Sequence, residues 1–233
     1  MKPIPLSIKT YPFQLLEKEK LTSNLGLWNG KMGTAIYLLH LSQITEDENC
    51  ALHANELIDD VCETISLEIP FYFGNGLLGI GCGLQYIIDE QFMAGDSDEI
   101  LSEIDQMAKN AINSRPTNSL TIENGVCGIG FYLYHRLKNR TENDESITTL
   151  KLKEHLIYLI DWIEKLLLKT TEQQDYNDTY FLLCRLHQLN VFNHKVEKLI
   201  DFCLQKIVEH NCCVQDNYDL LGINSLKLLK LWM

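Results

Sequence analysis

The sequence lacks an excess of positive charge. Its 20 Lys and Arg residues face 32 Asp and Glu residues, which gives a formal net charge of −12. Nucleic acids and anionic lipid surfaces attract proteins through clustered basic side chains, and nothing of that kind offsets the acidic balance here. We therefore predict that the protein binds neither nucleic acid nor a membrane.

Long apolar runs and paired cysteine motifs are also missing. No segment reaches the roughly 20 apolar residues that span a bilayer, and residues 1–5 lack the apolar run of a secretory signal. The eight cysteines are scattered without any Cys-x-x-Cys pair, which is typical of reduced, buried thiols rather than of a disulfide framework. Cys82 and Cys127 in particular take repeat positions that hold hydrophobic residues elsewhere. We expect a cytoplasmic protein.

An Asn-Gly-x-x-Gly motif occurs three times and organises what is present. It begins at Asn29, Asn75 and Asn124, at a spacing of about 50 residues, which indicates a repeat of supersecondary units. A weaker copy at Asn177 lacks both glycines, and another at residues 218–223 keeps the second one. Asn is a good helix N-cap, and apolar residues at three- and four-residue spacing follow each copy, so each motif predicts the start of a helix.

More polar, one-sided helices are predicted between the copies. Glycines share one face of the motif helices, and we expect them there because a neighbouring helix approaches closely. The alternation predicts an all-α array of helical hairpins with an inner and an outer layer. We expect residues 1–24 to form an arm or short capping helix and residues 25–233 to form one domain. The segments predicted as outer helices are residues 51–62, 97–111, 147–168 and 194–208.

The motifs allow several readings as a functional site. Gly74, Gly76 and Gly79 match a dinucleotide fingerprint, but the other copies lack its first glycine and no βαβ context follows. His40 and His135 take the same repeat position and either line a shared cavity or, as we favour, make hydrogen bonds between helices. If the inner helices run parallel, the residues at their starts gather at one rim, where helix N-termini favour an anion. The candidate rim residues are Trp28, Asn29, Asn75, Glu123, Asn124, Tyr176 and Asn177.

These hairpins resemble the lanthionine synthetase C-like family, the cyclases of lanthipeptide maturation. Residues 26–35, 75–81 and 124–130 carry the resemblance, which extends over most of the chain. It implies an α/α toroid of seven hairpins. It also implies a zinc ion that lowers the pKa of a substrate cysteine, so that the thiolate adds to a dehydroamino acid.

The sequence departs from this family at the zinc ligands. In the family they are a Cys in a Trp-Cys-x-Gly motif and a Cys-His pair in a Cys-His-Gly motif. We therefore expect no catalytic residue, metal ligand or cofactor in this chain, although the family implies zinc. None of the corresponding pairs here offers Cys or His: Trp28-Asn29, Gly74-Asn75, Glu123-Asn124, Tyr176-Asn177 and Asn217-Tyr218.

The number of copies also falls short of the family's ring. About five inner helices predict an open, toroid-like array, and the apolar residues 228–233 would leave an exposed patch at its C-terminal end. We expect a homodimer, or a second protein in a hetero-oligomer, to cover that end. The leading hypothesis is a zinc-less peptide-binding or accessory subunit in lanthipeptide-type peptide modification. The alternatives are an active cyclase or another α/α-toroid enzyme, including a glycan-processing one, completed by a partner chain, and a non-catalytic helical scaffold.

Overall fold

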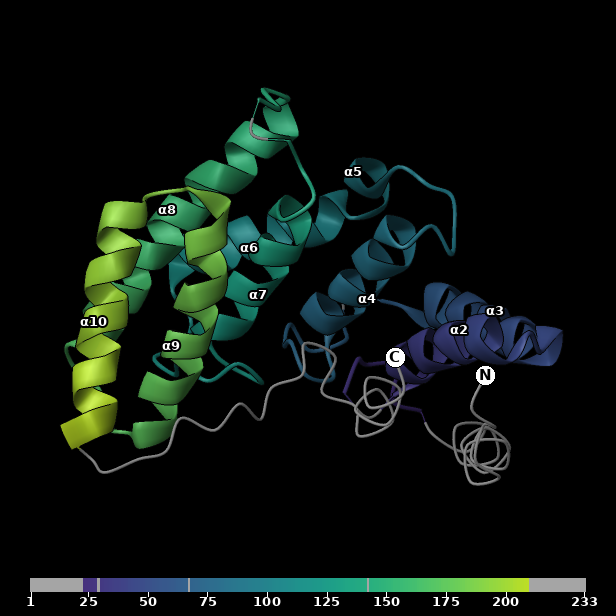
Figure 1. The fold of residues 1–233 in the computed structure, drawn as a ribbon, viewed down its shortest axis with the longest axis horizontal. Helices are drawn as coiled ribbons and strands as arrows, with labels where there is room; N and C mark the ends of the chain where they lie inside the picture. The colour runs from purple at the N-terminus through teal and green to yellow at the C-terminus, as the bar shows by residue number, and fades with distance from the viewer. Residues whose placement is uncertain (1–22, 29, 67, 142, 210–233) are drawn as a thin grey trace.

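The computed structural model describes residues 23–28, 30–66, 68–141 and 143–209. Within these residues the fold is all-helical, as predicted, with nine α-helices, one short 3-10 helix and no β-strand (Figure 1). The segments before two of the repeat helices, residues 69–73 and 119–122, are irregular loops. The predicted arm up to residue 22 and the fifth repeat copy at residues 218–223 lie outside the described residues. None of the described helices is both long and apolar enough to cross a membrane.

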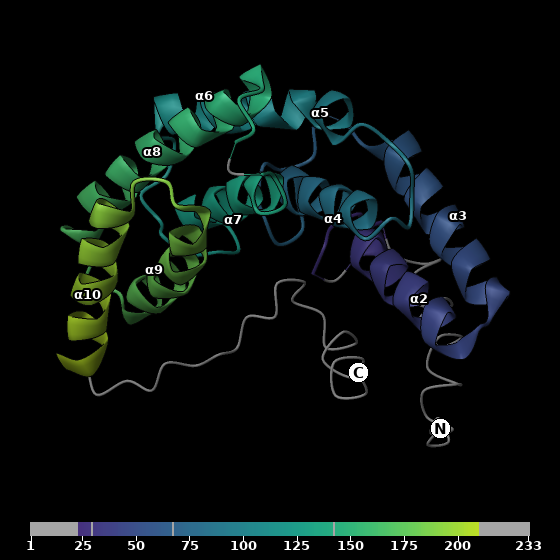
Figure 2. The same cartoon turned by 45° about the horizontal axis from the view of Figure 1, so that its top comes forward.

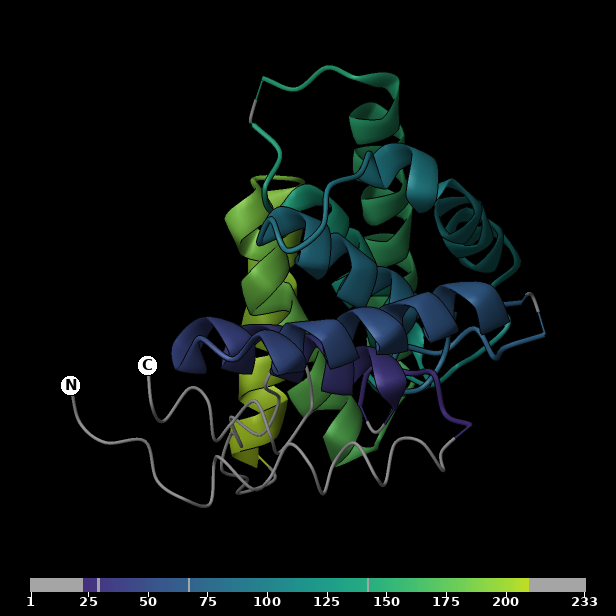
Figure 3. The same ribbon diagram turned by 90° about the vertical axis from the view of Figure 1, so that its right-hand side faces the viewer.

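The helices form two curved layers, which Figure 2 shows from above. The predicted alternation of inner and outer helices is confirmed, and Figure 3 shows that the first hairpin runs crosswise to the last. The inner helices are α2 (Lys31–Thr45), α4 (Leu77–Asp89), α7 (Val126–Leu137) and α9 (Gln173–Leu186). The outer helices are α3 (Glu48–Thr64), α5 (Ser97–Ile100), α6 (Ser102–Ser114), α8 (Ile147–Leu167) and α10 (Asn193–Glu209).

The hydrophobic core fills the space between the two layers. Outer helices bury one face, because their apolar residues recur at helical spacing, whereas α7 is buried along its whole length. Cys82 and Cys127 are only 2% and 0% exposed, so their predicted role as core residues is confirmed. Burial raises the pKa of both thiols, which keeps them neutral.

The glycines of the repeat have a different role from the one expected. Gly30, Gly76 and Gly125 take the N-cap positions of α2, α4 and α7, so the prediction that Asn caps these helices is wrong. A Cβ atom on Gly76 would clash with the carbonyl oxygen of Pro70, and one on Gly79 with that of Phe73. These glycines let the loop before each helix fold back against the helix start.

Close approach of a neighbouring helix explains only the later glycines. A Cβ on Gly83 would meet the side chain of Met32 in α2, and one on Gly130 would meet Leu182 in α9. At these positions the expectation from the sequence is correct. The motif glycines thus let the loops close against the helix starts, and the later glycines Gly83 and Gly130 set the spacing of the inner helices.

A buried charge cluster links the inner layer to the outer one. Arg136 in α7 is 1% exposed and donates to Asp105 at 2.8 Å, Asp98 at 2.8 Å and Gln85 at 2.6 Å. Burial alone would lower the pKa of Arg136, but the hydrogen bonds and charges of Asp105 and Asp98 outweigh it and raise the pKa. Sequence analysis missed this cluster, because it read the inner helices as apolar on nearly every side.

The outer segment predicted at residues 97–111 is two helices. Leu101 ends α5 with a non-helical ψ of 7° and is fully buried. The break lets Ser97 and Asp98 turn toward Arg136, which hydrogen-bonds to both. The polar cluster therefore explains why one amphipathic segment folds as a short and a longer helix.

Candidate functional site

The loops before the inner helices lie side by side and are joined by main-chain hydrogen bonds. The N–H groups of Leu27 and Trp28 donate to the carbonyl oxygen of Gly74, at 3.1 and 2.9 Å. Those of Phe73 and Gly74 donate in turn to the carbonyl oxygen of Glu123, both at 3.1 Å. This loop relay places equivalent residues of successive copies next to each other. It forms the rim of the inner layer that the sequence predicted.

At the centre of the rim, the side chains of Trp28 and Glu123 pack over Gly74. A Cβ atom on Gly74 would lie 2.9 Å from Cγ of Glu123 and 3.3 Å from Cε3 of Trp28, so both side chains pack over this glycine. Trp28 is half-buried and meets the ring of Phe73 edge-on, with the centroids 6.3 Å apart. Glu123 is exposed. The rim therefore combines an indole face with a carboxylate that reaches solvent.

Asn75 and Asn124 are exposed next to this centre. Asn124 lines a pocket of about 610 Å³ between the loop before α4, the end of α6 and the loop before α7, together with Tyr72, Thr117 and Ser119. This pocket has the volume of a small-molecule site and offers amide, hydroxyl and phenol groups. Asn29, the equivalent residue of the first copy, lies outside the described residues. Sequence analysis missed Tyr72 and Ser119, although both fall shortly before a motif glycine.

The fourth copy differs from the other three at the rim. Asn177 lies inside α9 rather than at its start, so it is not the predicted cap. Tyr176 is 4% exposed, and its hydroxyl donates to the carbonyl oxygen of Thr170 at 2.7 Å, so the structure places it in the core. Asn177 is half-buried, and its side-chain oxygen has no hydrogen-bond partner.

Two carboxylates continue the relay where the glycines are missing. Asp178 accepts a hydrogen bond from the N–H of Ile122 at 2.8 Å, and Asp175 accepts one from the N–H of Leu120 at 3.2 Å. Both are buried. Sequence analysis did not single them out, although two Asp residues three positions apart in the copy without glycines are a usable signal, since they lie on one helix face.

The two histidines at the same repeat position have different surroundings. Nε2 of His40 lies 2.7 Å from the hydroxyl of Tyr86 in α4, which confirms the predicted hydrogen bond between helices. His135 is 4% exposed, and neither of its ring nitrogens has a partner, so that prediction is wrong for His135. Burial, together with the charges of Lys138 and Arg185, lowers the pKa of His135 to about 3.

The helix N-termini do not form the expected anion site. The N–H groups of Lys31, Leu77 and Val126, which begin α2, α4 and α7, donate to loop carbonyl oxygens at 2.9 to 3.0 Å. A bound anion needs such N–H groups to be free. The exposed carboxylate of Glu123 also repels an anion. The rim is therefore better suited to neutral or positively charged groups.

The residues at the rim do not fit the zinc ion that the family resemblance implies. Zinc sites are built from Cys thiolates, His imidazoles and carboxylates, whereas the described rim offers amides and the carboxylate of Glu123, and the carboxylates of Asp175 and Asp178 already accept hydrogen bonds from loop N–H groups. Cys127, the nearest motif cysteine, is fully buried against Thr179, 3.5 Å from its hydroxyl. In the described part of the chain no group of three or more His, Cys, Asp and Glu side chains is placed to hold a metal ion.

Comparison with known proteins agrees with the repeat and its loops. The family model of lanthionine synthetase C-like proteins matches residues 22–184, which is well over half of the 233-residue chain. This match includes α2 to α8, the loop relay and most of α9. A search of curated proteins found no match. On its sequence and its helical repeat, the chain belongs to the lanthionine synthetase C-like family.

Proposed function

We propose that this protein binds a peptide at the rim and acts as an accessory subunit in peptide modification of the lanthipeptide type. The observation that carries the proposal is the pocket of about 610 Å³ lined by the loops before α4 and α7, which includes Asn124, the chain neighbour of Glu123. Aromatic faces and amide groups are what an extended peptide needs, because they supply contact area and partners for its main chain.

Binding without zinc chemistry follows from the residues at the ligand positions of the family. Zinc lowers the pKa of a substrate thiol, and so makes the nucleophile. Asn75 and Asn124 hold amides where the zinc-dependent members hold Cys or His. An amide donates and accepts hydrogen bonds but does not lower a thiol pKa enough to activate it, so these positions support recognition rather than cyclisation.

The arc of hairpins is, in this proposal, one part of an α/α toroid-like wall. A second copy of the chain or another protein of the pathway completes it beyond α10, and the residues at that end lie outside the described part. A stable monomer at micromolar concentration, measured by light scattering, would count against this completion. A cytoplasmic location stays a prediction, and the free thiol of the exposed Cys62 supports it.

Peptide selection tests the binding proposal. A phage-displayed library of peptides rich in Cys, Ser and Thr is selected on the purified full chain, and the enriched peptides are measured by fluorescence anisotropy. We expect Glu123→Lys and Asn124→Ala each to weaken binding about tenfold, which corresponds to about 1.4 kcal/mol. Asp201→Lys, an exposed change on α10, serves as the matched control and should bind like the unmodified chain.

Two results would overturn the proposal. Equal binding by the rim variants and the control would mean that the rim is not the site, and would favour a scaffold without a small ligand. Stoichiometric zinc in the purified protein, measured by mass spectrometry of the metals, would contradict the assignment of a zinc-less site and favour a cyclase.

A further inference from the structure

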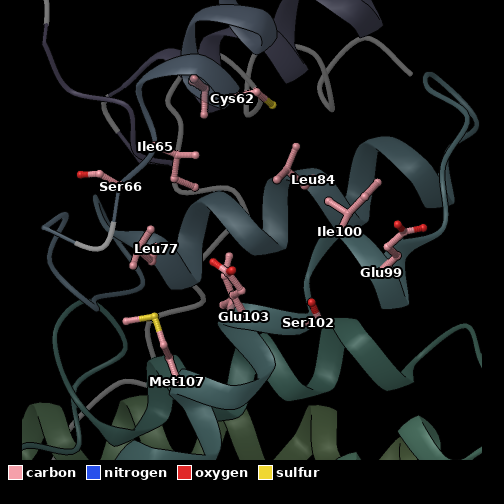
Figure 4. A pocket seen from close by; sticks show the side chains of 12 residues that line it. Cys62, Ile65, Ser66, Leu77, Leu84, Glu99, Ile100, Ser102, Glu103 and Met107 are labelled. Carbon is pink, nitrogen blue, oxygen red and sulfur yellow. The ribbon is translucent and has the colours of Figure 1, made fainter.

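A groove on the outer surface shares no lining residue with the pocket that carries the proposed function. It runs between the end of α3 and the α5–α6 pair, and Figure 4 shows it from close by. Leu77 and Leu84 of α4 form its floor, while Ile65 faces Ile100 and Met107 across it. The cavity has a volume of about 430 Å³. We call it the outer groove.

The outer groove marks a place where the outer layer is not closed. Helix α6 packs against α8, and α3 packs against α2, but α3 makes at most marginal contact with α5 or α6. Among the described residues, no outer helix closes the seam between α3 and the α5–α6 pair, although Leu77 and Leu84 beneath it are only 2% and 5% exposed.

Side chains in the outer groove are apolar at the floor and acidic at one wall. Ile100 is 43% exposed, which is unusual for a large apolar side chain beside a cavity. Glu99 and Glu103 line the same wall, and neither carboxylate forms an ion pair with a described Lys or Arg. No basic residue of the described chain lines the cavity. The seam between α6 and α8, by contrast, carries Lys109 and Lys151 beside its acidic groups.

We propose that the outer groove binds a basic amphipathic helix of a partner protein. Apolar side chains of that helix, spaced three and four residues apart, enter the cavity over Leu77 and Leu84. Its Lys or Arg side chains pair with Glu99 and Glu103. The charge complementarity decides the chemistry of the partner, because a purely apolar or an acidic helix would leave both carboxylates unpaired or repelled.

A designed helical peptide tests the groove directly. The probe is a fluorescent 14-residue peptide with Leu at positions i, i+3, i+4 and i+7 and Lys at its other positions, titrated into the full chain and followed by anisotropy. Maleimide labelling of Cys62, which is exposed at the groove wall, gives a second readout by peptide mass spectrometry. We expect binding that protects Cys62 and weakens with added salt.

Charge reversal gives the decisive comparison. Glu99→Lys with Glu103→Lys should weaken the Leu/Lys peptide at least tenfold and create binding of a matching Leu/Glu peptide. Glu145→Lys with Asp201→Lys makes the same change in net charge at exposed positions outside the groove and should leave affinity and Cys62 protection unchanged. A Lys/Ser peptide of equal charge should not protect Cys62.

Other results would overturn the proposal. Equal weakening by both double variants would reduce the binding to non-specific attraction to an acidic protein. Protection of Cys62 without peptide, at every protein concentration, would mean that another segment of this chain covers the groove. Protection that fades on dilution would identify a second copy as its occupant. Binding of small apolar molecules in place of the peptide would make it a ligand pocket.

Discussion

The two halves of the helical array are stabilised in different ways. In α2 to α4 the loops are sealed by main-chain hydrogen bonds and glycines, and only Thr34 and Gln85 are buried polar side chains. From α7 onward the core takes in charged and polar groups, and α9 seals the rim with side-chain carboxylates. These buried polar residues are His135, Arg136, Thr149, His155, Asp175, Asp178 and Thr179.

The difference shows that one repeat geometry is compatible with two kinds of chemistry. A loop N–H group needs an acceptor, and either a carbonyl oxygen or a carboxylate oxygen provides it. Where a main-chain carbonyl oxygen accepts the hydrogen bond, the close packing depends on glycines, which have no Cβ atom. Where a side-chain carboxylate accepts it, stability depends on an ionisable group that must stay hydrogen-bonded in the interior. Each half should therefore respond to a different perturbation.

Replacing a glycine of the first half by alanine should have the largest effect on the free energy of unfolding. In Gly79→Ala the new Cβ meets the carbonyl oxygen of Phe73, which the loop relay holds in place. We expect a loss of about 3 kcal/mol in the free energy of unfolding, measured by urea denaturation with circular dichroism. Gly95→Ala is the control, since its new Cβ meets only the end of the Ile100 side chain. An unchanged unfolding midpoint in Gly79→Ala would refute the steric account.

Removing a carboxylate from the second half should have a smaller effect. Asp178→Ala leaves the buried N–H of Ile122 without its acceptor, and an unsatisfied buried group costs about 1–3 kcal/mol. We expect about 2 kcal/mol in the same measurement, while Asp201→Ala on the exposed face of α10 should be neutral. If Asp178→Ala unfolds like the control, the carboxylate does not seal the rim.

The pH dependence of stability should show the smallest difference. His135 has a pKa of about 3 in the folded chain, below the ordinary value of 6.5, so the unfolded chain binds a proton more readily. Its contribution to stability is complete above pH 6.5 and is lost as the pH falls toward 3. When the pH falls from 8 to 5.5, the free energy of unfolding of the unmodified chain should decrease by about 1 kcal/mol more than that of His135→Phe.

Denaturation series at several pH values check this difference. The comparison uses His135→Phe against the unmodified chain, so that the titration of all other groups cancels. His194→Gln, on the exposed face of α10, is the control substitution. Parallel stability curves for the native chain and His135→Phe would show that the imidazole is not buried in neutral form.

The sequence was sufficient for the elements but not for the contacts between them. The repeated glycines and the one-sided helices predicted the helices and their inner and outer positions, because both signals lie within one segment. The hydrogen bonds from Trp28 to Gly74 and from Gly74 to Glu123 leave no trace in the side chains, since they are made by the main chain. The caps were misplaced by one residue for the same reason.

The candidate site was predicted only where the repeat stays regular. Trp28, Glu123 and the neighbouring Asn75 and Asn124 lie in the loops of the relay, since equivalent positions of regular copies meet, and their role in binding stays a prediction. Tyr176 lies in the core because α9 begins at Gln173, before Asn177. The helix of the copy without glycines therefore starts earlier in the repeat than the helices of the other copies. Arg136 was overlooked because its partners Asp98 and Asp105 come from another helical pair, more than 30 residues away.

The loop relay also bears on how this family diverges. The rim loops are joined through main-chain atoms, and the side chains of Glu123 and Asn124 take no part in those main-chain hydrogen bonds. Selection can exchange them without altering the wall beneath. A rim with metal ligands and a rim with amides then differ by a few substitutions, and these substitutions leave the main-chain hydrogen bonds of the loops unchanged.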